Sequence, residues 1–150
     1  RLIPDIVRAI QSKEKVFIRN PSSTRPWQHV FEPLNGYLMV AEDLYVNGSA
    51  NNSSWNFGPH LSDIRTVNEL TEIFCTAWGI TDIVEYDTNT YLHEANLLSL
   101  DISKAYHQLR WRPQWTLEQS MVHIVDWYQE YISSGDVVSL SKSQIKSFFK

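Results

Sequence analysis

Two arginines flank a turn near the start of the sequence. Arg19 precedes the turn at residues 20–23, and Arg25 follows it and leads into the aromatic segment 27–30. The planar guanidinium group of arginine binds phosphate oxygens through paired hydrogen bonds, and a neighbouring aromatic ring can support a base or a sugar ring. The segment is therefore a candidate for binding a phosphorylated ligand. In a simpler interpretation both arginines are solvated turn residues and Trp27 lies in the core.

A second candidate is the pair His93-Glu94. A neighbouring imidazole and carboxylate can hydrogen-bond sugar hydroxyls or act together as an acid and a base. Adjacent residues on a strand point to opposite faces, however, so the two side chains need not share a site. A surface pair is the alternative.

Other kinds of site lack their sequence signatures. The single cysteine, Cys75, excludes an internal disulfide and a cysteine-based zinc site, and we expect it to be a buried small hydrophobe. The sequence contains no Gly-x-Ser-x-Gly, Gly-x-Gly-x-x-Gly or Walker A motif. The histidines show no HxxxH or HxH spacing; they are His29, His60, His93, His107 and His123. We therefore expect no metal site, no Ser-His-Asp hydrolase site and no dinucleotide site in this chain.

Length and charge limit the function further. The 150 residues suit one domain, and a composition of 43% hydrophobic and 20% charged residues is ordinary for a globular protein. A net charge of -4 without a run of Lys and Arg disfavours binding to nucleic acid. We find no membrane-spanning run and no signal peptide, so we expect a cytoplasmic protein. The chain begins at Arg1, already in a helical pattern, which suggests truncation.

Hydrophobic spacing predicts a mixed α/β (α+β) fold of about five helices and several short strands. Two Ser/Thr-x-x-Glu/Gln capping boxes, at Thr66 and Thr116, predict two of the helix starts. The predicted helices cover 2–12, from Pro33 to the Asn47-Gly48 pair, 66 to about 79, 101–109, and 116 to just before Gly135. The predicted strands are 16–19, 27–30, 55–57 and 82–86. Residues 137–150 carry a weaker secondary-structure signal and are predicted to form a tail.

In this order the segments resemble the later half of CDP-glucose 4,6-dehydratases, which are extended short-chain dehydrogenases/reductases. The Arg25-Pro26-Trp27-Gln28-His29-Val30 and His93-Glu94-Ala95 elements point to the CDP-glucose branch. The motifs at 101–105 and 109–113 are shared by many sugar-nucleotide epimerases and dehydratases. One departure is Arg110, where these proteins usually have Gly.

The resemblance implies a small C-terminal domain without a complete Rossmann domain. We expect residues 1–136 to form a sugar-nucleotide-binding domain, with the tail 137–150 packed on it. In the intact family, NAD is the cofactor, and the Gly-rich cofactor loop and the Tyr-x-x-x-Lys base pair lie in the N-terminal half. Neither motif is in this sequence, since Tyr86 and Tyr91 lack a lysine four residues on.

The resemblance also implies roles for the candidate residues. Arg25 is expected to bind the diphosphate, Phe17, Ile18 and Arg19 to meet the base, and His93 and Glu94 to lie near the sugar or the phosphates. The chain would bind a nucleoside diphosphate sugar, with CDP-glucose preferred, and would be inactive alone. One alternative is an enzyme completed by a separate Rossmann-type polypeptide. Another is a truncated, non-catalytic fragment that self-associates, as a homodimer, through its exposed apolar surface.

Overall fold

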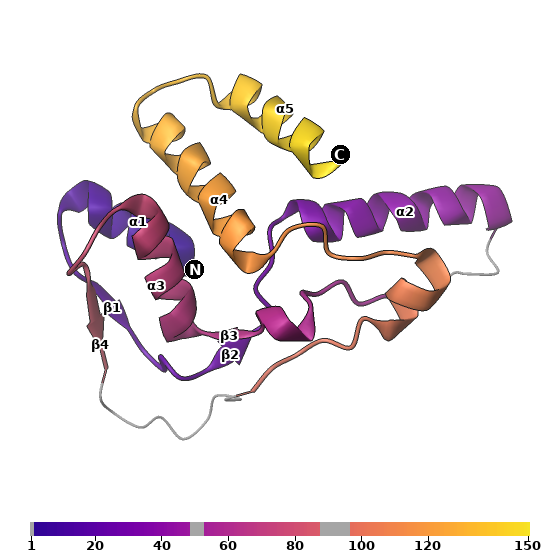
Figure 1. The fold of residues 1–150 in the computed structure, drawn as a ribbon, viewed down its shortest axis with the longest axis horizontal. Coiled ribbons are helices and arrows are strands. Elements are labelled where there is room, and N and C mark those ends of the chain that lie inside the picture. Colours follow the sequence, from indigo (N-terminus) through magenta and orange to yellow (C-terminus); the bar gives the residue numbers. More distant parts are fainter. Residues whose placement is uncertain (1, 49–52, 88–96) are drawn as a thin grey trace.

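The structure is a computed structural model, and it describes residues 2–48, 53–87 and 97–150. Figure 1 shows helices around two very small sheets. The helices are α1 (Leu2–Ser12), α2 (Phe31–Asn47), the 3₁₀ helix η2 (Leu61–Asp63), α3 (Val67–Trp78), the π-helical turn η3 (Ala105–Leu109), α4 (Leu117–Ile132) and α5 (Val137–Phe148). The strands are β1 (Val16–Ile18), β2 (Thr24–Arg25), β3 (Arg65–Thr66) and β4 (Val84–Tyr86). The predicted fold class, mixed α/β with about five helices and few short strands, is confirmed.

Each sheet in the described residues has two strands that are distant in the sequence. β1 pairs in parallel with β4, so that Val16 lies opposite Val84 and Ile18 opposite Tyr86. β2 pairs antiparallel with β3. Parallel strands need a long crossover connection, and here it includes α2 and α3.

The capping boxes fix where α3 and α4 begin. The Thr66 hydroxyl accepts the Glu69 N–H at 3.1 Å, and the Glu69 carboxylate accepts the Thr66 N–H at 2.7 Å. Thr116 and Gln119 make the same reciprocal pair at the start of α4. These bonds satisfy backbone donors that the first helical turn leaves unpaired. Both predicted helix starts are confirmed.

The main core lies between α1, α3, α4 and β1. Its fully buried members on α1 and α3 are Ile6, Leu70 and Phe74. A second cluster joins the loop before η2 to η3 and the segment after it, and consists of Phe57, Ala105, Leu109 and Trp111. α2 packs over this second cluster because Gly36 leaves room for the ring of Phe57, whose atoms lie 2.6 Å from where a Cβ would stand.

Two predicted strands are wrong. Residues 27–30 and 55–57 form no strand, and the strand in this region is β2, just before Trp27. The alternating polarity of residues 27–30 does not come from strand pairing. The side chains of this segment bind separate backbone carbonyls instead. Trp27 Nε1 donates to the Arg65 carbonyl at 3.2 Å, and Gln28 Nε2 donates to the Phe57 carbonyl at 2.8 Å.

The last helix, α5, is better formed than its weak sequence signal indicates. Asp136 caps it by accepting the Ser139 N–H at 3.0 Å, and Gln144 Nε2 donates to the His123 carbonyl of α4 at 2.8 Å. The division of the chain at residue 136 stays a prediction. In the described part of the chain, no helix combines the length and apolar character needed to cross a membrane.

Candidate functional site

The predicted base-binding segment is strand β1. Its side chains alternate, with Val16 and Ile18 buried and Phe17 58% exposed. The Val16 N–H donates to the Ile83 carbonyl at 2.8 Å, and the Ile18 carbonyl accepts the Asp87 N–H at 2.9 Å. Backbone groups alternate in direction along a strand, so the N–H and C=O groups of Phe17 point to the other edge of β1. That edge offers one donor and one acceptor beside an exposed aromatic ring.

The turn after β1 is held against the start of α3. Asn20 adopts a left-handed conformation with φ of 52°, and its carbonyl accepts the Ser23 N–H at 3.1 Å. The carbonyls of Pro21 and Ser23 accept the N–H groups of Asn68 and Val67, both at 2.9 Å. Because these bonds anchor the turn to a capped helix, the position of β2 relative to β1 is fixed.

Arg25 lies directly opposite Arg65 in the β2–β3 pair. The Arg25 side chain is half-buried, and its Nη1 donates to the Thr24 carbonyl at 2.7 Å. Arg65 Nη1 donates to the carbonyls of Ser62 and Ile64, and its Nη2 lies 3.9 Å from the Glu118 carboxylate. Like charges opposite each other destabilise a strand pair. Guanidinium groups bind phosphate oxygens through paired hydrogen bonds, so the β2–β3 pair is a candidate phosphate site.

His93 and Glu94 lie outside the described residues, so their predicted role is not tested. The described residues on both sides of them lie near β1 and β2. The Asp87 N–H binds the Ile18 carbonyl at 2.9 Å, and the Leu98 N–H donates to the Thr24 hydroxyl at 3.3 Å. Asp87 therefore lies at the β4 edge of β1, and Leu98 lies beside β2.

Glu32 organises the scaffold behind β2. Its buried carboxylate accepts the Gln114 N–H at 3.0 Å and the Trp115 N–H at 2.9 Å. Its carbonyl accepts the indole N–H of Trp111 at 3.2 Å. Burial raises the pKa of Glu32, and the hydrogen bonds from Trp115 and Gln114 oppose that rise. Since the carboxylate is occupied by backbone donors, Glu32 joins α2 to the start of α4.

His29 is buried beside this scaffold. Its ring packs edge-on against Phe31 and Trp115, with ring centroids 4.5 and 4.9 Å away. Its Nδ1 accepts the Phe31 N–H at 3.2 Å. Burial, and to a smaller extent the nearby His123, lower the pKa of His29 to about 4. The imidazole is therefore neutral at pH 7 and belongs to the core.

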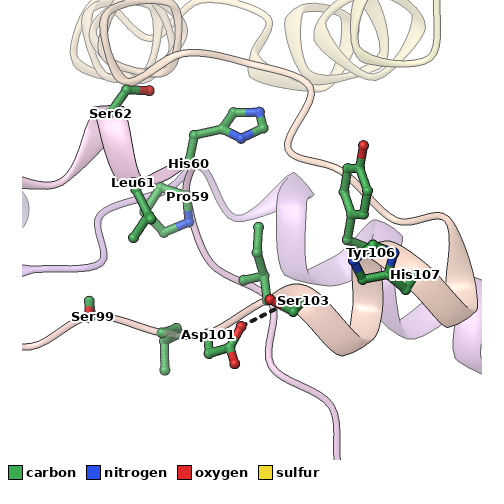
Figure 2. A pocket seen from close by; sticks show the side chains of 11 residues that line it. Pro59, His60, Leu61, Ser62, Ser99, Asp101, Ser103, Tyr106 and His107 are labelled. Carbon is green, nitrogen blue, oxygen red and sulfur yellow. Dashed lines mark hydrogen bonds between the residues drawn. The ribbon is translucent and has the colours of Figure 1, made fainter.

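The structure also contains a cavity that the sequence did not predict. It measures about 580 Å³ and lies between the loop before η2 and the segment that leads into η3. Figure 2 shows His60 on one side of it, Tyr106 and His107 on another, and Asp101 bound to Ser103 below them. Hydrogen bonds from Ser103 lower the pKa of Asp101, so its carboxylate is charged at neutral pH. Of the predicted site residues that the structure describes, none lines this cavity: Phe17, Ile18, Arg19 and Arg25 all lie elsewhere.

No sequence signal could have revealed this cavity. Its wall includes the π-helical turn η3, and the polar side chains come from segments that are distant in the sequence. Among the described residues, no three His, Cys, Asp or Glu side chains gather closely enough to hold a metal ion.

Sequence comparison finds one informative relative. The chain is 43% identical over 148 residues to the CDP-glucose 4,6-dehydratase of Salmonella typhimurium. The match covers 99% of this chain and 41% of that enzyme. The chain is homologous to CDP-glucose 4,6-dehydratase. It spans about two fifths of the length of this dehydratase, and no family model matches it.

Comparison with solved structures gives the same fold as in dTDP-glucose 4,6-dehydratases. The enzyme from Bacillus anthracis, in complex with NAD, matches with a TM-score of 0.69 and 23% identity over 87% of this chain and 39% of that one. The enzyme from Streptomyces venezuelae, with NAD and TYD bound, matches with a TM-score of 0.72 and 23% identity over 91% of this chain and 40% of that one. The fold of this dehydratase homologue is thus that of the C-terminal part of these extended short-chain dehydrogenases/reductases.

Proposed function

We propose that this chain binds the nucleotide end of CDP-glucose through the outer edge of β1 and through Arg25. The observation that carries the proposal is the position of Arg25, which follows the turn after β1 and lies opposite Arg65 of β3. A diphosphate offers several charged oxygens to which arginine guanidinium groups can donate. The 43% identity to a CDP-glucose 4,6-dehydratase supports CDP-glucose as the preferred ligand.

The base would lie against β1. The C=O and N–H groups of Phe17 on the outer edge can pair with the donor and acceptor edge of a pyrimidine, while the exposed Phe17 ring offers a stacking surface. Arg19, exposed at the end of β1, would complete this edge. From the family resemblance, His93 and Glu94 would lie near the sugar or the phosphates.

The glycines of this chain do not fit a dinucleotide cradle. Gly48 and Gly79 are helix C-caps with positive φ. At Gly36 and Gly58 the space where a Cβ would stand is occupied by the side chains of Phe57 and Leu100. A pyrophosphate cradle requires closely spaced glycines between a strand and a helix. We therefore propose that NAD and the dehydration chemistry of the relatives depend on the part that this chain does not span.

Ligand titration tests the binding proposal. CDP-glucose, CDP, UDP and GDP are titrated by calorimetry and by NMR at ligand concentrations up to about 5 mM, because a half-built site binds weakly. CDP ligands should bind best, and Arg25→Ala should weaken binding by about tenfold or more, since a charged hydrogen bond to phosphate contributes over 1 kcal/mol.

The matched control is Arg8→Ala, which removes an exposed arginine that pairs with Asp5 on α1. Its affinity should equal that of the original chain. Saturable binding that is equal in Arg25→Ala and the original chain would contradict the assignment of Arg25. Absence of any CDP signal at 5 mM, with the fold intact by circular dichroism, would contradict the proposal as a whole.

A second candidate function is a dehydratase completed in trans by an NAD-binding polypeptide. The observation that favours it is the coverage, since the chain aligns over nearly its whole length with 41% of an active enzyme's sequence. With NAD and CDP-glucose, the purified chain alone should give no 4-keto-6-deoxy sugar. Addition of a separate NAD-binding polypeptide should then give product. Product from the chain alone would show that the catalytic groups lie within it.

A further inference from the structure

Trp27 binds both strands of the β2–β3 pair. Its backbone N–H donates to the Arg25 carbonyl of β2 at 2.9 Å, and its indole N–H donates to the Arg65 carbonyl of β3 at 3.2 Å. Arg25 and Arg65 lie opposite each other in this pair, which Figure 1 shows at the start of α3. One residue therefore contacts the main chain of both arginines.

The first of these bonds closes a tight turn directly after Arg25. It spans a single residue, Pro26, and the proline ring fixes φ near the value of about −75° that a three-residue turn of this kind requires. β2 ends at Arg25, and the ring of Trp27 packs against the main core. Arg25 is thus connected to the core through a residue only two positions away.

The second bond crosses a strand pair that has little else to hold it. β2 and β3 have two residues each, and Arg25 and Arg65 place like charges at facing positions. The Arg65 guanidinium group donates to the carbonyls of Ser62 and Ile64. Its Nη2 also lies 3.9 Å from the Glu118 carboxylate. These contacts direct the Arg65 side chain toward η2 and α4, so the indole bond to the Arg65 carbonyl is what Trp27 adds across the pair.

We propose that Trp27 is a positioning residue for phosphate binding, because its indole N–H holds β3 against β2 and so orients Arg25 toward the diphosphate of a nucleotide. The Nη1 of Arg25 donates to the Thr24 carbonyl at 2.7 Å, so the direction of its guanidinium group depends on the main chain of β2. Trp27 itself does not touch the ligand. This inference rests on the proposed function, since Trp27 acts only through Arg25.

The first test needs no ligand. Trp27→Phe removes the indole N–H and keeps an aromatic ring in the core. Trp55→Phe is the matched control, because Trp55 is also partly buried and its indole N–H has no hydrogen-bond partner among the described residues. The backbone carbon chemical shifts of Arg25 and Arg65, measured by NMR, should move toward random-coil values in Trp27→Phe and stay unchanged in Trp55→Phe. The shifts of α3 and α4 should stay unchanged in both variants. Unchanged shifts of both arginines in Trp27→Phe would overturn the proposal.

Titration of CDP, followed by NMR, tests the effect on binding. Trp27→Phe should weaken CDP binding by about three- to tenfold, the equivalent of one net hydrogen bond, whereas Trp55→Phe should change it by less than about twofold. In an Arg25→Ala background, Trp27→Phe should weaken CDP binding by less than about twofold, because its effect passes through Arg25. An equal loss in both backgrounds would show a general structural role for Trp27 and would overturn the proposal.

The two proposals fail in different ways. If the original chain does not bind CDP, or if Arg25→Ala binds it equally well, the proposed function is wrong and the role of Trp27 in binding is wrong with it. If CDP binding depends on Arg25 but is unchanged in Trp27→Phe, only the role of Trp27 is wrong.

Discussion

The buried carboxylate of Glu32 accepts the backbone N–H of Trp115 at 2.9 Å and so ties the start of α2 to the residue that precedes the α4 capping box. Gln114 donates to the same carboxylate at 3.0 Å. These bonds join the α2 side of the molecule to the core formed by α1, α3 and α4. The first prediction concerns the cost of breaking them.

Replacement of Glu32 by Ala should lower the free energy of unfolding by about 2 kcal/mol or more, because two partly buried N–H groups lose their acceptor. Glu32→Gln keeps one acceptor oxygen and should cost roughly half as much. Urea unfolding followed by tryptophan fluorescence measures both. Glu14→Ala, on an exposed loop, should change stability by less than about 0.5 kcal/mol. Equal effects of Glu32→Ala and Glu14→Ala would show that the Glu32 bonds do not support the fold.

Stability should fall as the pH is lowered from about 6.5 to about 4, because His29 titrates differently in the two states. Its pKa is about 4 in the folded chain against 6.5 for the free side chain, so the unfolded chain binds the proton first. Above pH 6.5 this contribution is fully present, and it is lost on acidification by up to about 3 kcal/mol.

The measurement is urea unfolding at several pH values between 4 and 7.5 for the original chain and for His29→Asn. The asparagine oxygen can accept the Phe31 N–H but does not titrate, so the variant should lose stability less steeply on acidification. His107→Asn, at an exposed site, is the control and should keep the original slope. An unchanged slope in His29→Asn would contradict the assignment.

Replacement of Arg110 by Gly should stabilise the chain, by up to about 1 kcal/mol. Arg110 ends the π-helical turn in a left-handed conformation, with φ of 59° and ψ of 18°. This conformation crowds the Cβ of any residue except glycine. Thermal unfolding should therefore give a higher Tm for Arg110→Gly, whereas Arg8→Gly, inside α1, should lower it. A lower Tm for Arg110→Gly would mean that the arginine side chain makes contacts worth more than the strain.

Replacement of Gly36 by Ala should destabilise the chain by about 1–3 kcal/mol, even though alanine favours a helix. The new Cβ would lie 2.6 Å from the Phe57 ring, which is confined by Trp111 at a centroid distance of 5.0 Å. Phe57→Leu should offset part of the cost of Gly36→Ala, and a double-mutant cycle measures this coupling. Additive effects of the two substitutions would show that the two residues do not press on each other.

Local signals in the sequence predicted much of the fold. The capping boxes at Thr66 and Thr116 placed α3 and α4, since both partners of each box lie within one helical turn. β1 and β4 were also predicted, from β-branched residues. The β2–β3 pair was not predicted, because two-residue strands carry no periodicity and exist only through pairing between Thr24 and Thr66. The segment at Trp27 showed alternation without being a strand, because its side chains have unrelated partners.

The candidate site, like the fold, was predicted from the sequence only in part. The type and spacing of Arg19 and Arg25 were visible in the sequence, whereas the position of Arg65 opposite Arg25 depends on a long-range pairing. Arg110 was noted in the sequence as a departure from a usual glycine, and its left-handed conformation is known only from the structure. The cavity at His60 and Tyr106 could not be predicted, because its walls meet only in the folded chain.

The parallel pairing of β1 with β4 has a consequence for synthesis of the chain. Val16 cannot find its partner until Val84 has left the ribosome, which at about 5–20 residues per second takes on the order of several seconds. During this interval the nascent β1 can bond only to water or to a chaperone. Ribosome-bound chains stalled before residue 84 should therefore be more sensitive to protease at β1 than chains stalled after the complete sequence.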